Sequence, residues 1–178
     1  MKEDAQGHRG TGAREARSPG GSGNGRRRLA LVASKGSLDG AYPPLILAAT
    51  AASLGWEVGI FFTFYGLDIL HRKRHRKLKV APVGNPAMPV SVPNLVGMLP
   101  GMTAAATRMM KGWMKRQNLP TVPEFLDMAR ESGVKLFACS TTMGVMGIEA
   151  KDLVPGADVA GATAFLDFAA DADVSLFV

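Results

Sequence analysis

The chain has 178 residues, of which 47% are hydrophobic and 20% charged, and its formal net charge is +6. This length and composition are ordinary for one soluble α/β domain with a substantial core. Because Cys139 is the single cysteine, an internal disulfide and a zinc site of four thiolates are excluded. With no apolar signal segment, the sequence predicts a reducing, cytoplasmic location.

Positive charge is concentrated in two segments. Residues 1–28 carry seven Lys/Arg against three acidic residues, and residues 71–79 carry six Lys/Arg and no acidic residue. Residues 1–27 are rich in Gly, Arg and Ser and lack apolar periodicity, so they cannot bury enough surface to offset the entropy of ordering. We therefore expect a disordered tail over 1–27 and a single domain over 28–178.

Apolar runs and turn signals predict an alternation of strands and helices in the first half of this domain. In chain order we expect a strand over 28–34, a polar turn over 35–40, a helix over 45–54, a strand over 56–65 and a short helix over 67–70. Pro43 and Pro44 suit the first turn of the helix, where an N–H group is not needed, and Gly55 suits its end.

The second half continues this alternation. We expect a loop over 81–101, helices over 103–117 and 121–132, a strand over 134–139, a strand over 158–161, a helix over 162–171 and a last strand over 174–178. Thr121 and Glu124 form the pattern of a capping box. Five apolar strands alternating with helices predict a three-layer α/β/α fold with a mainly parallel sheet, flavodoxin-like in outline.

Residues 41–66 allow a second interpretation. They contain a single charged residue, Glu57, and are long enough to cross a bilayer. The Gly55 stop signal and the polar residues around it favour a buried helix followed by a buried strand.

Cys139 is the main candidate functional residue. It ends a buried apolar strand and is followed by Ser140, Thr141 and Thr142 at the start of a helix. Chemistry in open α/β sheets takes place at the carboxyl ends of strands, and the free N–H groups of a helix start favour a thiolate. A small buried cysteine without function is the alternative, and the hydroxyl residues favour the reactive thiol, with Ser140 and Thr142 in support.

Two other groups could act with this thiol. Lys35 lies in the turn after the first strand and could point over the same sheet edge, although this turn lacks the spacing of a phosphate-binding loop. His71 and His75 could pair with Cys139 only if the basic run folds over it. The sequence predicts no metal site and no cofactor.

The basic run 71–79 is expected on a solvated face, because its charges are too dense to be buried. It could dock an acidic partner or an anionic membrane. No aromatic residues alternate with these charges, so nucleic acid is an unlikely partner. The methionines between residues 81 and 118 either fill an irregular core or line a surface for partners or a lid over the thiol.

Several segments of the domain resemble the DsrE/DsrF-like family, and most closely its second DsrE subgroup, which often carries a peroxiredoxin-like label. The most specific are Phe61-Phe62-Thr63-Phe64 and the Cys-x-x-Thr-Met-x-x-Met-Gly pattern over 139–147. Further matches lie at 31–39, 57–67, 109–111, 146–148 and 176–178. The resemblance covers about residues 28–178.

The resemblance implies a sulfur carrier or sulfurtransferase-like protein. Cys139 would hold sulfur as a persulfide and pass it between sulfur-relay proteins, such as rhodanese-like or small sulfur-carrier proteins, and the protein would form homo-oligomers. An acidic residue often follows the methionine in this subgroup, whereas this chain has Gly144. Two other functions stay open: a partner- or membrane-binding module with a structural cysteine, and a small-ligand domain with a pocket at the strand ends.

Overall fold

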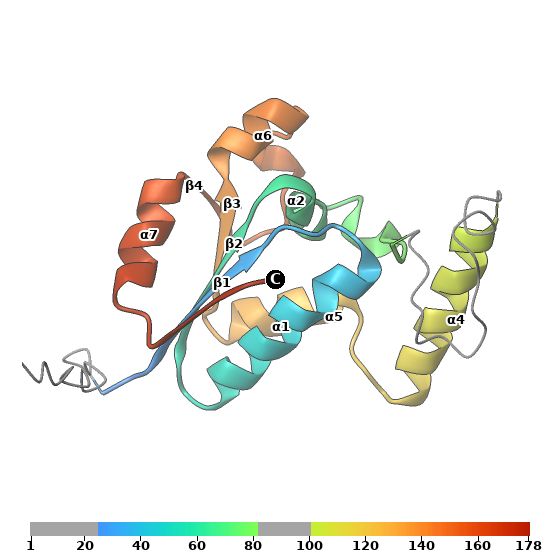
Figure 1. Cartoon of the computed structure of the whole chain (residues 1–178), viewed down its shortest axis with the longest axis horizontal. Coiled ribbons are helices and arrows are strands. Elements are labelled where there is room, and N and C mark those ends of the chain that lie inside the picture. Colours follow the sequence, from blue (N-terminus) through green and yellow to red (C-terminus); the bar gives the residue numbers. More distant parts are fainter. Residues whose placement is uncertain (1–24, 82–100) are drawn as a thin grey trace, which may run out of the picture.

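A five-stranded parallel sheet forms the centre of the molecule (Figure 1). The structure is a computed structural model and describes residues 25–81 and 101–178. The strands are β1 (Arg28–Ala33), β2 (Glu57–Phe62), β3 (Lys135–Cys139), β4 (Ala157–Ala160) and β5 (Val174–Phe177). They lie in the order β4-β3-β2-β1-β5, and every pair is parallel. The predicted α/β class is confirmed.

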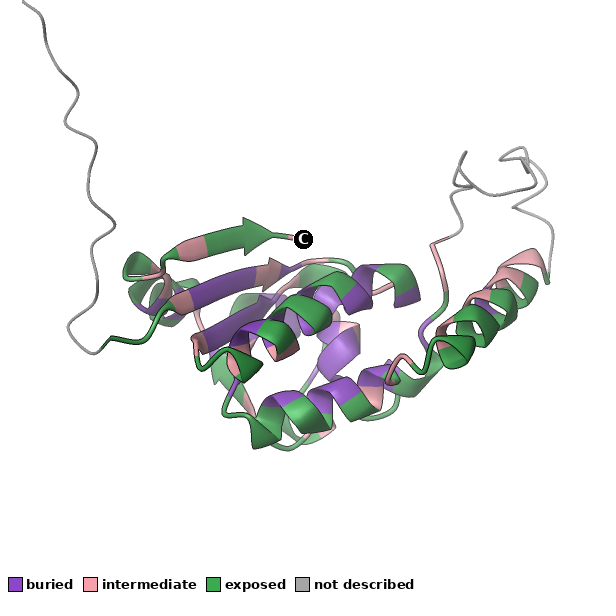
Figure 2. Cartoon of the chain, turned by 90° about the horizontal axis from the view of Figure 1, so that it is seen from below, coloured by how far each residue is buried: buried purple, intermediate pink, exposed green. Residues whose placement is uncertain are grey.

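Helices cover the sheet on both faces, so the predicted three layers are present. Helices α1 (Leu38–Ser53) and α5 (Val122–Glu131) lie on one face and α7 (Ala162–Ala170) on the other (Figure 1). Side chains alternate across a strand, so Ile60 joins the larger core and Phe61 joins a smaller core with Phe165 and Phe168. Figure 2 shows β5 largely exposed at one edge of the sheet.

Three further α-helices complete the described chain: α2 (Leu67–Leu70), α4 (Met102–Arg116) and α6 (Ser140–Met146). Single 3-10 turns lie at Phe64–Gly66, His75–Lys77 and Ala150–Asp152. The predicted helix over 103–117 is confirmed as α4, whose Met110 and Met114 pack against the core. The predicted tail over 1–27 lies almost wholly outside the described residues, and so does the predicted loop over 81–101.

The predicted start of the first helix is wrong. We expected it at Leu45, but α1 begins at Leu38 and contains both Pro43 and Pro44. The reason is Ser37, whose hydroxyl accepts a hydrogen bond from the N–H of Gly40 at 3.3 Å and caps the helix about two turns earlier. The two prolines therefore lie in the second turn of α1 rather than in its first.

The second strand is shorter than predicted. It ends at Phe62 rather than Tyr65, because Phe64 has a φ of 46°, in the left-handed region, and begins a 3-10 turn. This turn lies against the end of β1, where a Cβ on Gly66 would collide with the carbonyl oxygen of Ala33. The chain thus leaves the sheet abruptly at Thr63.

The membrane interpretation of residues 41–66 is wrong for the described chain. That segment is most of α1, a turn at Gly55, strand β2 and the 3-10 turn that follows it. Across 25–81 and 101–178, no helix has the length and apolar character needed to cross a bilayer.

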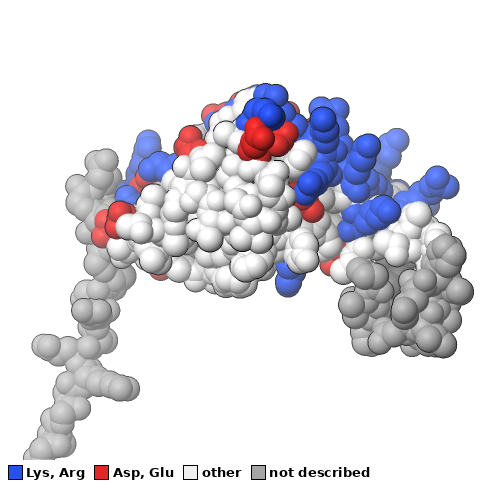
Figure 3. All heavy atoms as spheres, turned by 90° about the horizontal axis from the view of Figure 1, so that it is seen from above, with Lys and Arg blue, Asp and Glu red and all other residues white. Residues whose placement is uncertain are grey.

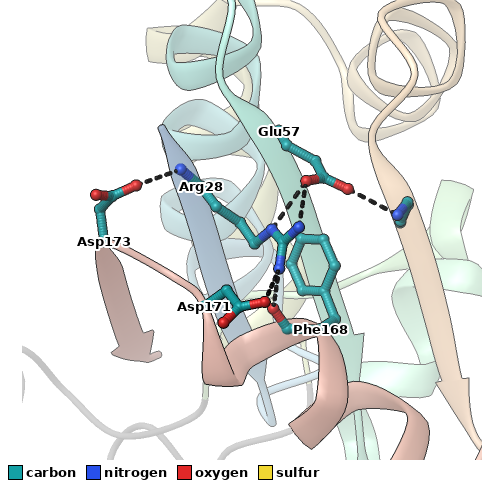
Figure 4. Close-up of polar contacts among 6 residues, drawn as sticks. Arg28, Glu57, Phe168, Asp171 and Asp173 are labelled. Carbon is teal, nitrogen blue, oxygen red and sulfur yellow. Dashed lines mark hydrogen bonds and ion pairs between the residues drawn. The ribbon is translucent and has the colours of Figure 1, made fainter. Parts of the chain in front are cut away.

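A charged cluster connects four elements at the amino ends of the strands (Figure 4). Arg28 donates from Nε to a Glu57 oxygen at 2.8 Å and from Nη1 to the Phe168 carbonyl at 3.0 Å. Its guanidinium lies 4.9 Å from the centre of the Phe168 ring. Lys135 reaches the other Glu57 oxygen at 2.8 Å, and Asp173 accepts from the Arg28 N–H at 2.7 Å. The cluster therefore holds β1, β2, β3 and α7 together at the edge opposite the thiol.

Candidate functional site

Cys139 is the last residue of β3 and the N-cap of α6. This position at the carboxyl edge of the sheet agrees with the strand-to-helix turn that the sequence predicts. The residue is 7% exposed, and it packs in the smaller core with Ala30, Phe61 and Phe165. Its thiol is therefore held by a hydrophobic wall on the α7 side.

A chain of hydroxyl groups contacts the thiol from the other side. Thr142 donates from Oγ1 to the sulfur of Cys139 at 3.4 Å. The same Oγ1 lies 3.1 Å from the hydroxyl of Thr63 and accepts from the backbone N–H of Phe64 at 3.4 Å. A hydroxyl has one proton, so Thr142 can donate to sulfur only if Thr63 donates to Thr142. The hydrogen bonds thus all point towards the sulfur.

The sheet register explains why Thr63 lies beside the thiol. Phe62 pairs with Ala138, so the residue after each of them lies at the same edge of the sheet. Phe64, which follows Thr63, has a left-handed φ and donates its N–H to Thr142. Such a conformation is unfavourable for a bulky residue by about 1–3 kcal/mol, and strained residues of this kind cluster at functional sites.

The pKa of the Cys139 thiol is lowered from its ordinary value. Burial is the largest single contribution and raises the pKa, because it disfavours the charged form. The hydroxyl and the backbone N–H of Thr142, the hydroxyl of Thr63 and the N–H of Thr141 act against it and together outweigh it. The surroundings therefore favour the thiolate, which is the nucleophilic form.

The structure brings two of the four predicted site residues together and leaves the other two away from the sulfur. Cys139 and Thr142 are in contact. Ser140 is exposed and makes no hydrogen bond to the sulfur. Its hydroxyl lies near Gly161 instead: a Cβ added to that glycine would be 3.9 Å from the Ser140 Oγ. Lys35 is also exposed, packs its side-chain stem against Gly40, and is not among the groups that change the pKa of the thiol.

Sequence reasoning missed Thr63, whose hydroxyl the structure places 3.1 Å from that of Thr142. The available signal was its place directly after the apolar run of β2, because polar residues that end neighbouring parallel strands meet at one edge. The hydroxyl residues predicted at the site are neighbours of Cys139 in the sequence, whereas Thr63 is 76 positions away.

The basic run lies away from the thiol. Its six Lys/Arg residues are exposed, as predicted, while His71 and His75 are buried. His71 accepts from the N–H of Lys73 at 3.2 Å, and His75 contacts the carbonyl oxygen of His71 at 2.8 Å. Neither histidine contributes to the pKa shift of Cys139. Within the described chain, no group of three or more His, Cys, Asp or Glu could hold a metal ion.

The fold and site define a class: an open parallel α/β domain with one hydrogen-bonded, thiolate-favouring cysteine at a strand end. The chain belongs to the DsrE/DsrF/DrsH-like family, whose model matches residues 25–177. This confirms the family resemblance of the sequence.

Relatives align over almost their whole lengths. The chain is 43% identical over 159 residues to the sulfur carrier protein DsrE2 of Allochromatium vinosum, covering 86% of this chain and 99% of that protein. It is 35% identical over 162 residues to the uncharacterized protein YrkE of Bacillus subtilis, covering 85% of this chain and 97% of that protein. The crystal structure of the Escherichia coli protein YchN superposes with a TM-score of 0.48 and 11% identity, covering 85% of this chain and 99% of that one.

Proposed function

We propose that this protein is a sulfur carrier that holds one sulfur atom as a persulfide on Cys139. The observation that carries the proposal is the hydrogen-bonded chain from Thr63 through Thr142 to the sulfur. It stabilises a thiolate at the edge of the sheet where this fold class does chemistry. The similarity to the Allochromatium sulfur carrier protein supports the same role.

Loading is a substitution at sulfur and needs no oxidant. The Cys139 thiolate attacks the outer sulfur of a donor persulfide, R–S–SH, and a new S–S bond forms while the donor S–S bond breaks. The electron pair of the broken bond leaves with the donor as R–S⁻. The product is Cys139–S–SH, and the rate follows the thiolate fraction, the nucleophilicity of the sulfur and access to it.

Unloading reverses these roles. An acceptor thiolate attacks the outer sulfur of the persulfide, and Cys139 leaves as a thiolate. The hydrogen bonds of Thr142 favour this step as well, because a thiol with a lower pKa is a better leaving group. The outer sulfur extends about 2 Å beyond Cys139, which brings it closer to a partner than the buried thiol itself.

The absence of a second cysteine in the sequence determines where the sulfur goes. Cys139 cannot form an intramolecular disulfide, so the sulfur must leave to another chain or a small thiol. A peroxidase that resolves its cysteine within one chain is excluded by the same count. We propose sulfur-relay proteins of the reducing cytoplasm as partners, rhodanese-like or small sulfur carriers, and a homo-oligomeric assembly.

The six exposed cations of residues 71–79 are the proposed docking surface for an acidic partner. Figure 3 shows Lys and Arg side chains gathered on one side of the molecule. Arg74 is paired with Asp68 at 2.8 Å, which leaves five cations of the run for a partner. Long-range attraction of this kind mainly raises the rate of association.

Transfer to an acceptor tests the proposal. Protein loaded with polysulfide is freed of excess donor and mixed with a small thiol in one turnover. We expect one sulfur atom per chain to pass to the acceptor, with unmodified Cys139 recovered. Sulfur that stays on the protein through many equivalents of acceptor would contradict a carrier role. Binding to anionic vesicles without any sulfur uptake would favour the alternative of a membrane-binding module with a structural cysteine.

A further inference from the structure

A small cavity lies under the basic run, away from Cys139. Its volume is about 210 Å³, and it is lined by the 3-10 turn of the run, the start of α5 and the segment before β4. The lining residues are Arg72, His75, Arg76, Pro123, Leu126, Asp127, Val154 and Pro155. The site combines positive charge with an apolar wall, and the sulfur chemistry does not use it.

Two of the six cations of the run line this cavity. Arg72 and Arg76 line it, whereas Lys73 and Lys77 do not. One acidic residue, Asp127, belongs to the lining, and its carboxylate is paired with Arg130 at 3.3 Å. The two arginines therefore outnumber the single acidic residue of the lining.

His75 supplies a third polar group. The residue is 7% exposed, and its Nδ1 lies 2.8 Å from the carbonyl oxygen of His71. A carbonyl can only accept, so Nδ1 carries the proton of this hydrogen bond and Nε2 is the remaining polar atom of the ring. A neutral Nε2 can accept a hydrogen bond from the hydroxyl of an oxyanion such as monohydrogen phosphate, and a protonated Nε2 can donate a hydrogen bond to an anion oxygen.

The backbone of the cavity is anchored before any ligand binds. Arg72 donates its N–H to the carbonyl of Asp152 at 2.8 Å, and His71 forms a β-bridge with Leu153. These contacts fix the run against the segment that follows α6. A preformed site loses less entropy on binding than one that must be ordered.

We propose that this cavity binds a small free oxyanion, such as phosphate or thiosulfate, between Arg72, Arg76 and His75. The planar guanidinium groups donate pairs of hydrogen bonds that match oxyanion geometry. The wall formed by Pro123, Leu126, Val154 and Pro155 keeps water from one side of a bound anion and so favours these charge-assisted bonds. The proposal does not depend on sulfur loading at Cys139.

Two double variants with the same change in charge test the proposal. Arg72→Gln with Arg76→Gln removes both cavity cations, and Lys73→Gln with Lys77→Gln removes two cations of the same run outside the cavity. Calorimetric titration with phosphate and with thiosulfate, at constant ionic strength, measures the affinity. We expect the arginine pair to weaken binding at least about tenfold, the effect of losing charge-assisted bonds, and the lysine pair to change it less than about twofold. Equal losses would show a diffuse basic surface and overturn the proposal.

A second measurement uses the unchanged protein, so its result does not depend on whether the variants fold. In imidazole NMR spectra, phosphate should shift the ring signals of His75 in a saturable way and leave His71 nearly unchanged, because His71 does not line the cavity. No saturable shift of His75 up to high phosphate concentrations would overturn the proposal.

Discussion

Thr142 lies one helical turn after Cys139 and donates to its sulfur at 3.4 Å, while Thr63 from the neighbouring strand end lies 3.1 Å from the same hydroxyl. The thiol is thus stabilised by two elements that are far apart in the sequence. This arrangement makes the reactivity of Cys139 depend on the packing of β2 against β3.

Thr142→Val should slow the reaction of Cys139 with iodoacetamide near neutral pH. Valine keeps the shape but removes the donor to sulfur, and hydrogen bonds to charged groups contribute about 1.5–3 kcal/mol, which corresponds to roughly tenfold or more in thiolate fraction. Thr63→Val should have a smaller effect in the same direction. Thr141→Val is the matched control, since Thr141 acts through its backbone N–H. Equal labelling rates in Thr141→Val and Thr142→Val would show that the hydroxyl chain does not activate the thiol.

The lowered pKa of Cys139 predicts a dependence of stability on pH. The thiolate is favoured in the folded state, so it adds to the free energy of unfolding. This added stability is complete above the pKa of the unfolded thiol, about 8.5, and is lost as the pH falls through the lower pKa of the folded state. The difference in unfolding free energy between the unchanged protein and Cys139→Ser should therefore grow as the pH rises through this window. Urea unfolding at several pH values measures it, and a difference that falls with rising pH would show a raised pKa instead.

Arg28→Ala should lower the free energy of unfolding by about 2–4 kcal/mol. The change removes the partly buried pair with Glu57, the hydrogen bond to the Phe168 carbonyl and the stacking on its ring. Arg130→Ala is the control, because its exposed pair with Asp127 should contribute less than about 1 kcal/mol. Urea unfolding compares the two, and similar losses would mean that the cluster of Figure 4 does not stabilise the fold.

Gly144→Ala should stabilise the protein by about 0.5–1 kcal/mol, because glycine in an exposed helix costs this much relative to alanine. Gly144 lies within α6, and a Cβ there would meet no atom within 4 Å. Gly144→Asp places an acidic residue in the same open space. If this acid tunes the thiol, the aspartate variant should change the rate of iodoacetamide labelling while the alanine variant leaves it unchanged.

Elements with a strong local pattern could be predicted from the sequence. The apolar runs of β1 and β3 and the capping box of Thr121 and Glu124 depend on residues next to one another, and the structure confirms them. The start of α1 could not be predicted in this way, because Pro43 and Pro44 suggested a helix start that the Ser37 cap overrides.

The candidate site was predicted only in part for a similar reason. Thr142 follows Cys139 in the sequence, and its contact could be inferred from that spacing. Thr63 reaches the site through the pairing of Phe62 with Ala138, a register that no local pattern specifies. Lys35 was expected at the thiol from its place after a strand, but its side chain packs against Gly40 instead.

Intact mass after incubation with polysulfide tests the central claim most directly. The unchanged protein should gain one sulfur atom, which dithiothreitol removes, and peptide mapping should place it on Cys139. Cys139→Ser, checked for folding by circular dichroism, should gain none. A folded protein that takes up no sulfur, or a serine variant that still does, would contradict a persulfide carrier based on Cys139.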